Sequence, residues 1–278
     1  MYTGYWRLQQ DPFSNSLDDR FFFQTSQHEE AIARLLYAAR QRKHGTVLTG
    51  GYGSGKSLVR RIFLQRLPEI GSFTVAQVDN PLLSPSALLQ DIAGQIEQRS
   101  DSLPEGAEAL RKIASVMRNR QRQGVHGIIL VEEAQLLADM ERLDQLRLLM
   151  NLEGDQGKPL VTVILIGAAE LMGYVRNNPS LRQRVSGCWS LGYLTREQTR
   201  EYINHRLRVA GGNGWIFDDS AVDVIFSYSK GTPRVINQVS DMALYLGMAE
   251  SVVQINDKIA QRVIADIKRS FAGLEDPP

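Results

Sequence analysis

The run Gly50–Ser57, which reads Gly-Gly-Tyr-Gly-Ser-Gly-Lys-Ser, constrains the fold of this chain more than any other stretch. Its glycines let the main chain approach a bound anion without a Cβ in the way, and a helix that starts here would point unpaired N–H groups at that anion. The preceding residues Thr46–Thr49 are β-prone, and Leu58–Leu67 repeats apolar residues at helical spacing. Strand, loop and helix in this order predict an α/β fold with an anion site at the loop.

The spacing of the loop is that of the phosphate-binding loop of nucleoside triphosphatases, the P-loop or Walker A motif. We expect Lys56 to reach the β- and γ-phosphates of ATP and the Ser57 hydroxyl to ligate Mg²⁺. A glycine-rich turn that binds nothing is the alternative, and the placement between strand and helix argues against it. The remaining candidates for nucleotide binding in and after the loop are Gly50, Gly51, Tyr52, Gly53, Ser54, Gly55 and Leu58.

A second motif lies where a buried strand is expected to end. Gly127–Val131 is a continuous apolar run typical of a strand in a parallel sheet, and Glu132 and Glu133 follow it directly. Downstream of a P-loop this is the Walker B pattern, in which the first carboxylate holds Mg²⁺ through water and the next one deprotonates the attacking water. A solvated acidic turn is the alternative.

Size and composition limit the class of protein. The chain has 278 residues, of which 43% are hydrophobic and 23% charged, as in a soluble globular protein. The net charge of +1 creates no field that would attract nucleic acid or a membrane. Cys188 is the single cysteine, which excludes an internal disulfide and fits a reducing compartment. We find neither a leader segment nor a membrane span, and we expect a cytoplasmic protein.

Strand and helix patterns divide the chain into two expected domains. They alternate over residues 1–193, which predicts a nucleotide-binding α/β sandwich around a parallel sheet. Residues 1–27 are rich in aromatic rings, and we assign them to this domain as a lead segment packed beside the nucleotide pocket. Residues 194–278 show only helical patterns and are expected to form a small helical domain.

The lead segment ends in a predicted helix start. Ser26 is the expected N-cap, with Glu29 as its capping-box partner. His28 in this first turn is either a contact to the adenine or the helical domain, or a solvated histidine.

These motifs together resemble AAA+ ATPases, and in particular the ExeA/GspA (general secretion pathway A) family. The resemblance implies an αβα sandwich with a parallel five-stranded sheet and a C-terminal helical lid. It also rests on ordered motifs along the chain: Asp11-Pro12-Phe13, Ser26–Glu30, Val131–Gln135, Leu181–Arg184 and Gly231–Arg234.

The resemblance assigns roles that spacing alone does not. It implies that Glu133 is the catalytic base and that Asn80 is the switch residue that restrains it. Arg184, or alternatively Arg182, resembles the arginine finger donated to a neighbouring subunit, although spacing alone favours a solvated helix face for both. Arg234 resembles the sensor arginine of the lid.

Two departures from the family pattern predict slow hydrolysis. The Walker B acid is usually Asp, whereas Glu132 is one methylene longer and would shift the water on Mg²⁺. The polar sensor residue after the fourth strand is replaced by Ala168.

The family resemblance predicts an oligomeric, Mg²⁺-dependent ATPase that forms a ring or filament with ATP between subunits and remodels a secretion or envelope partner. A DNA-binding transposition regulator of the TnsC/TniB type is the alternative. A nucleotide-gated adaptor that scarcely hydrolyses ATP is a third hypothesis, suggested by Ala168. The candidate DNA surface, for which a solvated helix face is the favoured explanation, consists of Arg111, Lys112, Arg118, Arg120 and Arg122.

Overall fold

The computed structural model describes residues 2–15, 18–98, 104–137 and 140–272. Contacts divide the chain into two compact units. The first, here named the α/β unit, consists of Thr25–Gly51 and Lys56–Leu191. The second, here named the helical unit, consists of Met1–Gln24, Tyr52–Gly55 and Gly192–Pro278.

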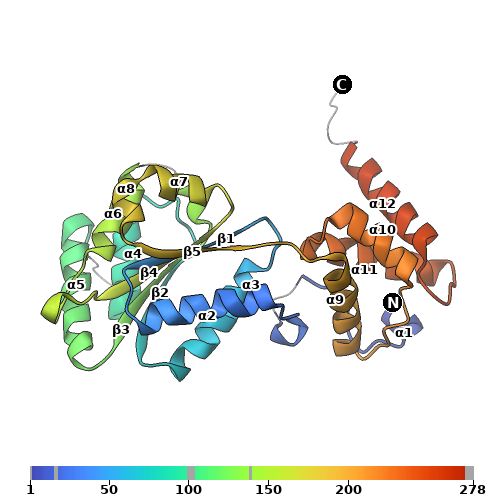
Figure 1. Ribbon diagram of the computed structural model, residues 1–278, viewed down its shortest axis with the longest axis horizontal. Helices are drawn as coiled ribbons and strands as arrows, with labels where there is room; N and C mark the ends of the chain where they lie inside the picture. The colour runs from blue at the N-terminus through green and yellow to red at the C-terminus, as the bar shows by residue number, and fades with distance from the viewer. Residues whose placement is uncertain (1, 16–17, 99–103, 138–139, 273–278) are drawn as a thin grey trace. The chain divides into compact units, whose positions relative to one another are not determined.

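A five-stranded parallel sheet forms the centre of the α/β unit, as the sequence predicts (Figure 1). The strands stand in the order β2-β3-β4-β1-β5, so that β1 lies between β4 and β5. Parallel strands present their carboxyl ends at one edge, which is where ligands bind in open α/β sheets. The strands are β1 (Gly45–Gly50), β2 (Phe73–Val78), β3 (His126–Val131), β4 (Val161–Gly167) and β5 (Val185–Leu191).

Helices cover both faces of this sheet (Figure 1). On one face α2 and α3 pack together, and on the other α4, α5 and α6 bury their apolar stripes against β2, β3 and β4. Because side chains alternate along a strand, Val131 and Leu165 point to the face covered by α4, α5 and α6 and are buried in the same apolar core as these helices. The helices are α2 (Ser26–Arg40), α3 (Lys56–Arg66), α4 (Pro85–Glu97), α5 (Gly106–Arg122), α6 (Met140–Met150), α7 (Leu171–Asn177) and α8 (Pro179–Arg182).

The helical unit has an apolar core of its own. Within it, α12 packs against both α10 and α11. A backbone hydrogen bond from Leu194 N to Gly231 O (3.0 Å) joins the segment before α9 to the turn before α11. The elements are α1 (Tyr2–Tyr5), the 3-10 helix η1 (Asp19–Phe21), α9 (Arg196–Val209), α10 (Asp219–Ser229), α11 (Pro233–Ala249) and α12 (Asp257–Ala272).

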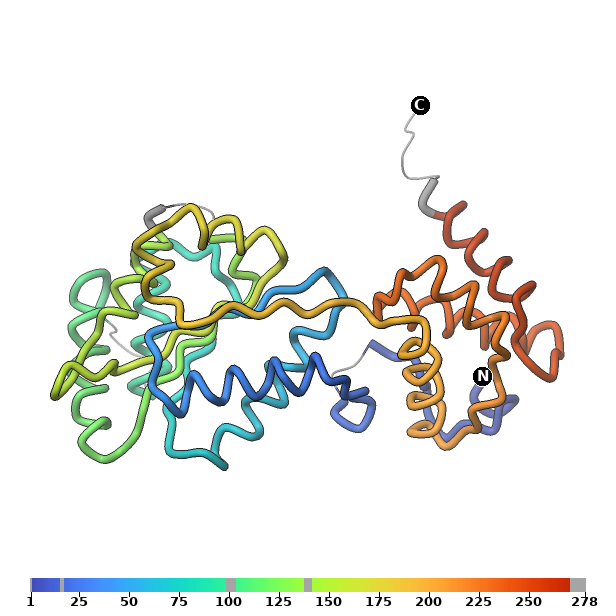
Figure 2. Tube along the Cα trace, in the orientation of Figure 1, coloured from blue at the N-terminus to red at the C-terminus, as the bar shows by residue number. Residues whose placement is uncertain are grey.

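The N-terminal segment packs in the helical unit, which corrects our assignment of it to the α/β domain. In Figure 2 its blue tube runs beside the orange helices of the C-terminal part. Trp6, Leu8, Phe13 and Phe21 are buried in the same core as the apolar residues of α9 and α11. Trp6 Nε1 also donates to Leu244 O (2.9 Å). The rings therefore bury against helices nearly two hundred residues away, which no local pattern reveals.

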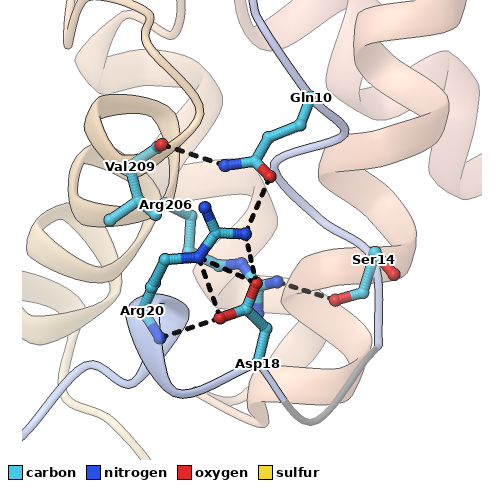
Figure 3. A network of polar contacts seen from close by, with 6 residues as sticks. All are labelled: Gln10, Ser14, Asp18, Arg20, Arg206 and Val209. Atoms are coloured by element: carbon cyan, nitrogen blue, oxygen red, sulfur yellow. Dashed lines mark hydrogen bonds and ion pairs between the residues drawn. The ribbon is translucent and has the colours of Figure 1, made fainter.

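Polar contacts hold the same segment on α9 (Figure 3). The Arg206 guanidinium donates to Ser14 O (2.7 Å), and Gln10 Nε2 donates to Val209 O (3.2 Å). Arg20 in turn donates to Gln10 Oε1 (3.2 Å). These bonds satisfy carbonyl groups at the end of α9 and in the segment itself, so both chain segments are ordered together.

None of the helices within the described ranges is long and apolar enough to cross a membrane.

Candidate functional site

The glycine loop connects β1 to α3, which begins at Lys56. Gly55 has a φ of 99°, where any other residue would be strained. The Lys56 ammonium donates to Gly50 O (2.8 Å) and Gly51 O (3.1 Å), which holds it against the loop. The Ser54 hydroxyl is buried and has no hydrogen-bond partner among the described residues. A buried hydroxyl without a partner is costly, and a phosphate oxygen would satisfy it.

The other predicted nucleotide contacts surround this loop. Ser57 is the second residue of α3 and is exposed, as its expected role as a Mg²⁺ ligand requires. Leu58 follows it and is half-buried, and the Tyr52 side chain is exposed.

Glu132 follows β3 directly and faces a positive charge that the sequence analysis missed. Arg60 Nε lies 2.7 Å from Glu132 Oε1, an ion pair whose N–H does not point at the oxygen. Arg60 also donates to Gln77 Oε1 (3.1 Å) and lies 3.4 Å from Asp79 Oδ1. Burial raises the pKa of the Glu132 carboxyl, and the Arg60 guanidinium partly offsets this rise. Since Arg60 stands one helical turn after Lys56, its position in the sequence was a usable signal.

Glu133 is held by a second residue that the sequence analysis did not single out. Gln135 Nε2 donates to Glu133 Oε2 (2.6 Å), and Gln135 Oε1 accepts from Ala168 N (2.8 Å). One amide therefore ties the predicted catalytic base to the residue after β4. Ala168, which stands where the family has a polar sensor side chain, thus makes a polar contact through its backbone N–H.

Two predicted residues make contacts with their neighbours in the sequence. The Asn80 side chain oxygen accepts from Leu82 N (3.1 Å) in its own turn. His28 is 8% exposed, which contradicts the solvated alternative. Thr25, and not Ser26, is the N-cap of α2, and His28 is its capping-box partner, with Nδ1 3.3 Å from Thr25 N.

The three candidate arginines lie at surfaces. Arg182 ends α8 and is exposed, and Arg184 is half-buried just before β5. In the described part of the chain neither guanidinium forms an ion pair, so both remain available to a neighbouring molecule. Arg234 is exposed in the first turn of α11. Within the helical unit, a Cβ added to Gly53 would lie 2.8 Å from Arg234 Cβ, so Arg234 lies next to Gly53.

The basic run on α5 is partly neutralised inside the α/β unit. Lys112 pairs with Glu97 (2.9 Å) and Arg122 with Asp155 (3.4 Å). Arg120 donates to the Thr74 hydroxyl. Arg111 and Arg118 are exposed. The surface predicted for DNA is therefore weaker than the sequence indicates.

These residues fit ATP and Mg²⁺. Lys56, the unpaired Ser54 hydroxyl and the start of α3 suit phosphate oxygens. Ser57 and Glu132 carry the hard oxygen atoms that Mg²⁺ prefers and would be its ligands. Among the described residues no cluster of three or more His, Cys, Asp or Glu could hold a metal by protein ligands alone.

Comparisons with known proteins agree with this geometry. A family model described as AAA domain matches residues 39–175. General secretion pathway protein A of Aeromonas hydrophila is 35% identical over 284 residues, which cover 99% of this chain and 49% of that protein. The chain thus spans about half the length of this curated relative.

Solved structures share the fold. The Aeropyrum pernix ORC1 protein in complex with DNA has a TM-score of 0.67 at 18% identity, covering 95% of this chain and 70% of that one. The Thermotoga maritima RuvB Holliday junction branch migration motor has a TM-score of 0.56 at 19% identity, covering 92% and 73%. Sheet, glycine loop and relatives together identify the chain as an AAA+ protein with the P-loop NTPase fold, similar to general secretion pathway protein A.

Proposed function

We propose that the chain binds Mg·ATP at the glycine loop and hydrolyses it. The observation that carries the proposal is the phosphate cradle, where the Lys56 ammonium rests on two loop carbonyls and the buried Ser54 hydroxyl has no partner among the described residues. Both groups gain stronger partners when phosphate oxygens arrive, because hydrogen bonds to charged groups are roughly twice as strong as neutral ones.

The two carboxylates at the end of β3 have different roles, one in binding Mg²⁺ and the other in accepting a proton. Ser57 and Glu132 would hold Mg²⁺, which, when bound, withdraws charge from the phosphates. Glu133 accepts the proton of the attacking water as the water oxygen bonds to the γ-phosphorus and the bond to ADP breaks. Lys56 neutralises charge that accumulates on the leaving side.

We propose further that the active form is an oligomer with ATP between subunits. Arg184, or alternatively Arg182, would reach the γ-phosphate of a neighbouring subunit, and Arg234 would sense the nucleotide within its own chain. Arg182 is exposed and Arg184 is half-buried beside β5, and neither forms an ion pair with another described residue, which supports this assignment.

The partner that we favour is a protein complex of secretion or envelope machinery, assembled or remodelled by this oligomer. The support is the 35% identity over 99% of the chain to general secretion pathway protein A. We place the chain in the cytoplasm because its proposed substrate, ATP, is supplied there.

Transposition regulation on DNA is the second candidate function, and the ion pairs of Lys112 and Arg122 count against its predicted surface. Fluorescence anisotropy on duplex DNA, with ADP and with a non-hydrolysable ATP analogue across a salt series, separates the two. Tight binding at physiological salt only with the analogue, lost when Arg111 and Arg118 become Ala, would favour the DNA function.

Equilibrium binding of labelled ATP and release of phosphate test the proposed chemistry. Lys56→Ala is expected to abolish tight ATP binding. Glu133→Gln is expected to leave ATP bound and to lower the hydrolysis rate by about 100-fold or more, because an amide cannot accept the proton. Unchanged ATP binding by Lys56→Ala would refute the phosphate cradle. Tight binding without turnover by the parent chain would instead favour the nucleotide-gated adaptor.

A further inference from the structure

The Gln135 side chain forms a bridge between the predicted catalytic base and the end of β4. Its amide nitrogen donates to Glu133 Oε2 at 2.6 Å, and its amide oxygen accepts from Ala168 N at 2.8 Å. Gln135 is 8% exposed and its bond to Ala168 N is buried, so water competes little for that bond. The bridge fixes the orientation of the amide, because the oxygen must face the backbone N–H and the nitrogen must face the carboxylate.

The end of β4 is shaped to admit this side chain. A Cβ on Gly167 would lie 2.6 Å from Gln135 Oε1 and 3.1 Å from Leu171 Cδ2, so a larger residue would displace the amide. Gly167 also pairs with Thr49 of β1, the residue before the last of the strand that leads into the glycine loop. The amide is therefore anchored to the part of the sheet that carries the loop.

The backbone conformation of Glu133 is unusual and explains why its side chain would need to be held by Gln135. Its φ of 47° and ψ of 37° lie in the left-handed region, which is unfavourable for a residue with a side chain. Strained backbone persists where its surroundings over-determine it, and it is common at catalytic positions. The bond from Gln135 restrains the side chain that this backbone projects.

We propose that Gln135 is a positioning residue for ATP hydrolysis. It holds Oε2 of Glu133 and thereby leaves Oε1 to accept the proton of the attacking water. The proposal rests on the proposed ATPase function and adds to it a residue that contacts the catalytic base. Gln135 acts through Glu133 and is not expected to touch the nucleotide.

Two substitutions separate positioning from a structural role. Gln135→Met has a similar shape and removes both hydrogen bonds. Gln135→Glu keeps an oxygen that accepts from Ala168 N, but it replaces the donor to Glu133 by a like charge. We expect both variants to lower kcat by about 10- to 100-fold, as a small misplacement of a catalytic group does. We expect the Kd for ATP to stay within about threefold of the parent value, because Lys56 and the loop are unchanged.

Hydrogen exchange of the Ala168 amide in the nucleotide-free chain supplies a readout independent of activity. The amide is expected to exchange slowly in the parent and in Gln135→Glu, and faster in Gln135→Met. In a Glu133→Gln background, Gln135→Met is expected to cause no further loss in single-turnover rate, since its effect passes through Glu133.

The outcomes are distinguishable. Parental kcat in Gln135→Glu together with loss in Gln135→Met would show that Gln135 is structural and would overturn the proposal. A further loss of rate in the Glu133→Gln background would do the same. Unchanged exchange of Ala168 in Gln135→Met would refute the bridge itself. A parent chain that binds ATP without hydrolysing it would refute the proposed ATPase, and with it the catalytic role of Gln135, while the exchange result would still report on the bridge.

Discussion

His126 makes the stability of the α/β unit depend on pH in a direction that the structure fixes. It opens β3 and is 1% exposed. The Thr162 hydroxyl donates to Lys43 O (2.6 Å), so its oxygen accepts from His126 Nε2–H (2.8 Å). His126 Nδ1 then carries no proton and has no hydrogen-bond partner among the described residues. Protonation would bury a charge without an acceptor.

Burial, with a smaller contribution from the positive charge of Arg42, lowers the pKa of His126 to about 3. In the unfolded chain a histidine takes up its proton near pH 6.5, whereas the folded unit does not. Stability is therefore full above the unfolded pKa and is lost as the pH falls below it. With these two pKa values, acidification from about pH 7.5 to about pH 5 lowers the free energy of unfolding by about 2 kcal/mol.

The assay uses Cys188, the single cysteine, which is exposed on β5 and can carry a fluorescent label that reports on the α/β unit. Urea unfolding is measured at both pH values for the parent chain and for His126→Gln, whose amide can donate to Thr162 but does not titrate. Contributions from all other groups cancel in the comparison. The variant is expected to lose about 2 kcal/mol less than the parent. Equal losses in the two chains would refute the argument that His126 is buried neutral.

Three further predictions concern the nucleotide site and the helical unit. Arg184→Ala is expected to lower the rate of ATP hydrolysis while leaving the ATP affinity of the isolated subunit intact. Mixing Arg184→Ala with Glu133→Gln subunits should restore activity at some interfaces, because each variant retains the residue that the other lacks. No recovery in a mixture shown to co-assemble would count against a shared site. Glu132→Gln is expected to raise the Mg²⁺ concentration needed for half-maximal turnover, because a neutral amide binds Mg²⁺ more weakly; an unshifted Mg²⁺ titration would contradict the assignment. Trp6→Ala is expected to destabilise the helical unit by about 3 to 5 kcal/mol, since it empties a buried site. Urea unfolding is followed by tryptophan fluorescence in a Trp189→Phe background, where the remaining tryptophans belong to the helical unit, and a loss below about 1 kcal/mol would show that the N-terminal segment is dispensable.

The sequence predicted those features that are encoded locally. The glycine loop, the apolar run of β3 and its two carboxylates each lie within a few residues, and the alternation of strands and helices indicated the parallel sheet. The predictions that were wrong concern positions where two neighbouring residues can fill the same role, or contacts between residues far apart in the chain. Thr25 and Ser26 can both cap α2, and only the chain geometry selects Thr25.

The missed contacts of the site arise from tertiary packing. Gln135 contacts Ala168 because the 3-10 helix η3 (Ala134–Leu136) packs against β4, although Gln135 and Ala168 are 33 residues apart in the chain. The aromatic rings of the N-terminal segment indicated burial, but composition does not say against which helix a ring packs. Asn80 follows β2 as expected, yet its side chain is used by its own turn.

The shared core of the first 24 residues and the C-terminal helices has a consequence for biosynthesis. Trp6 and Phe13 are synthesised long before α9, the earliest of the helices that cover them, which begins at Arg196. At a translation rate of about 5 to 20 residues per second, these rings wait roughly 10 to 40 s for their partners. The α/β unit can complete its sheet during that interval, because β5 ends at Leu191. The nascent chain thus carries an uncovered aromatic segment until α9 is made, and a chaperone that shields it would raise the yield of folded protein more than one that assists the sheet.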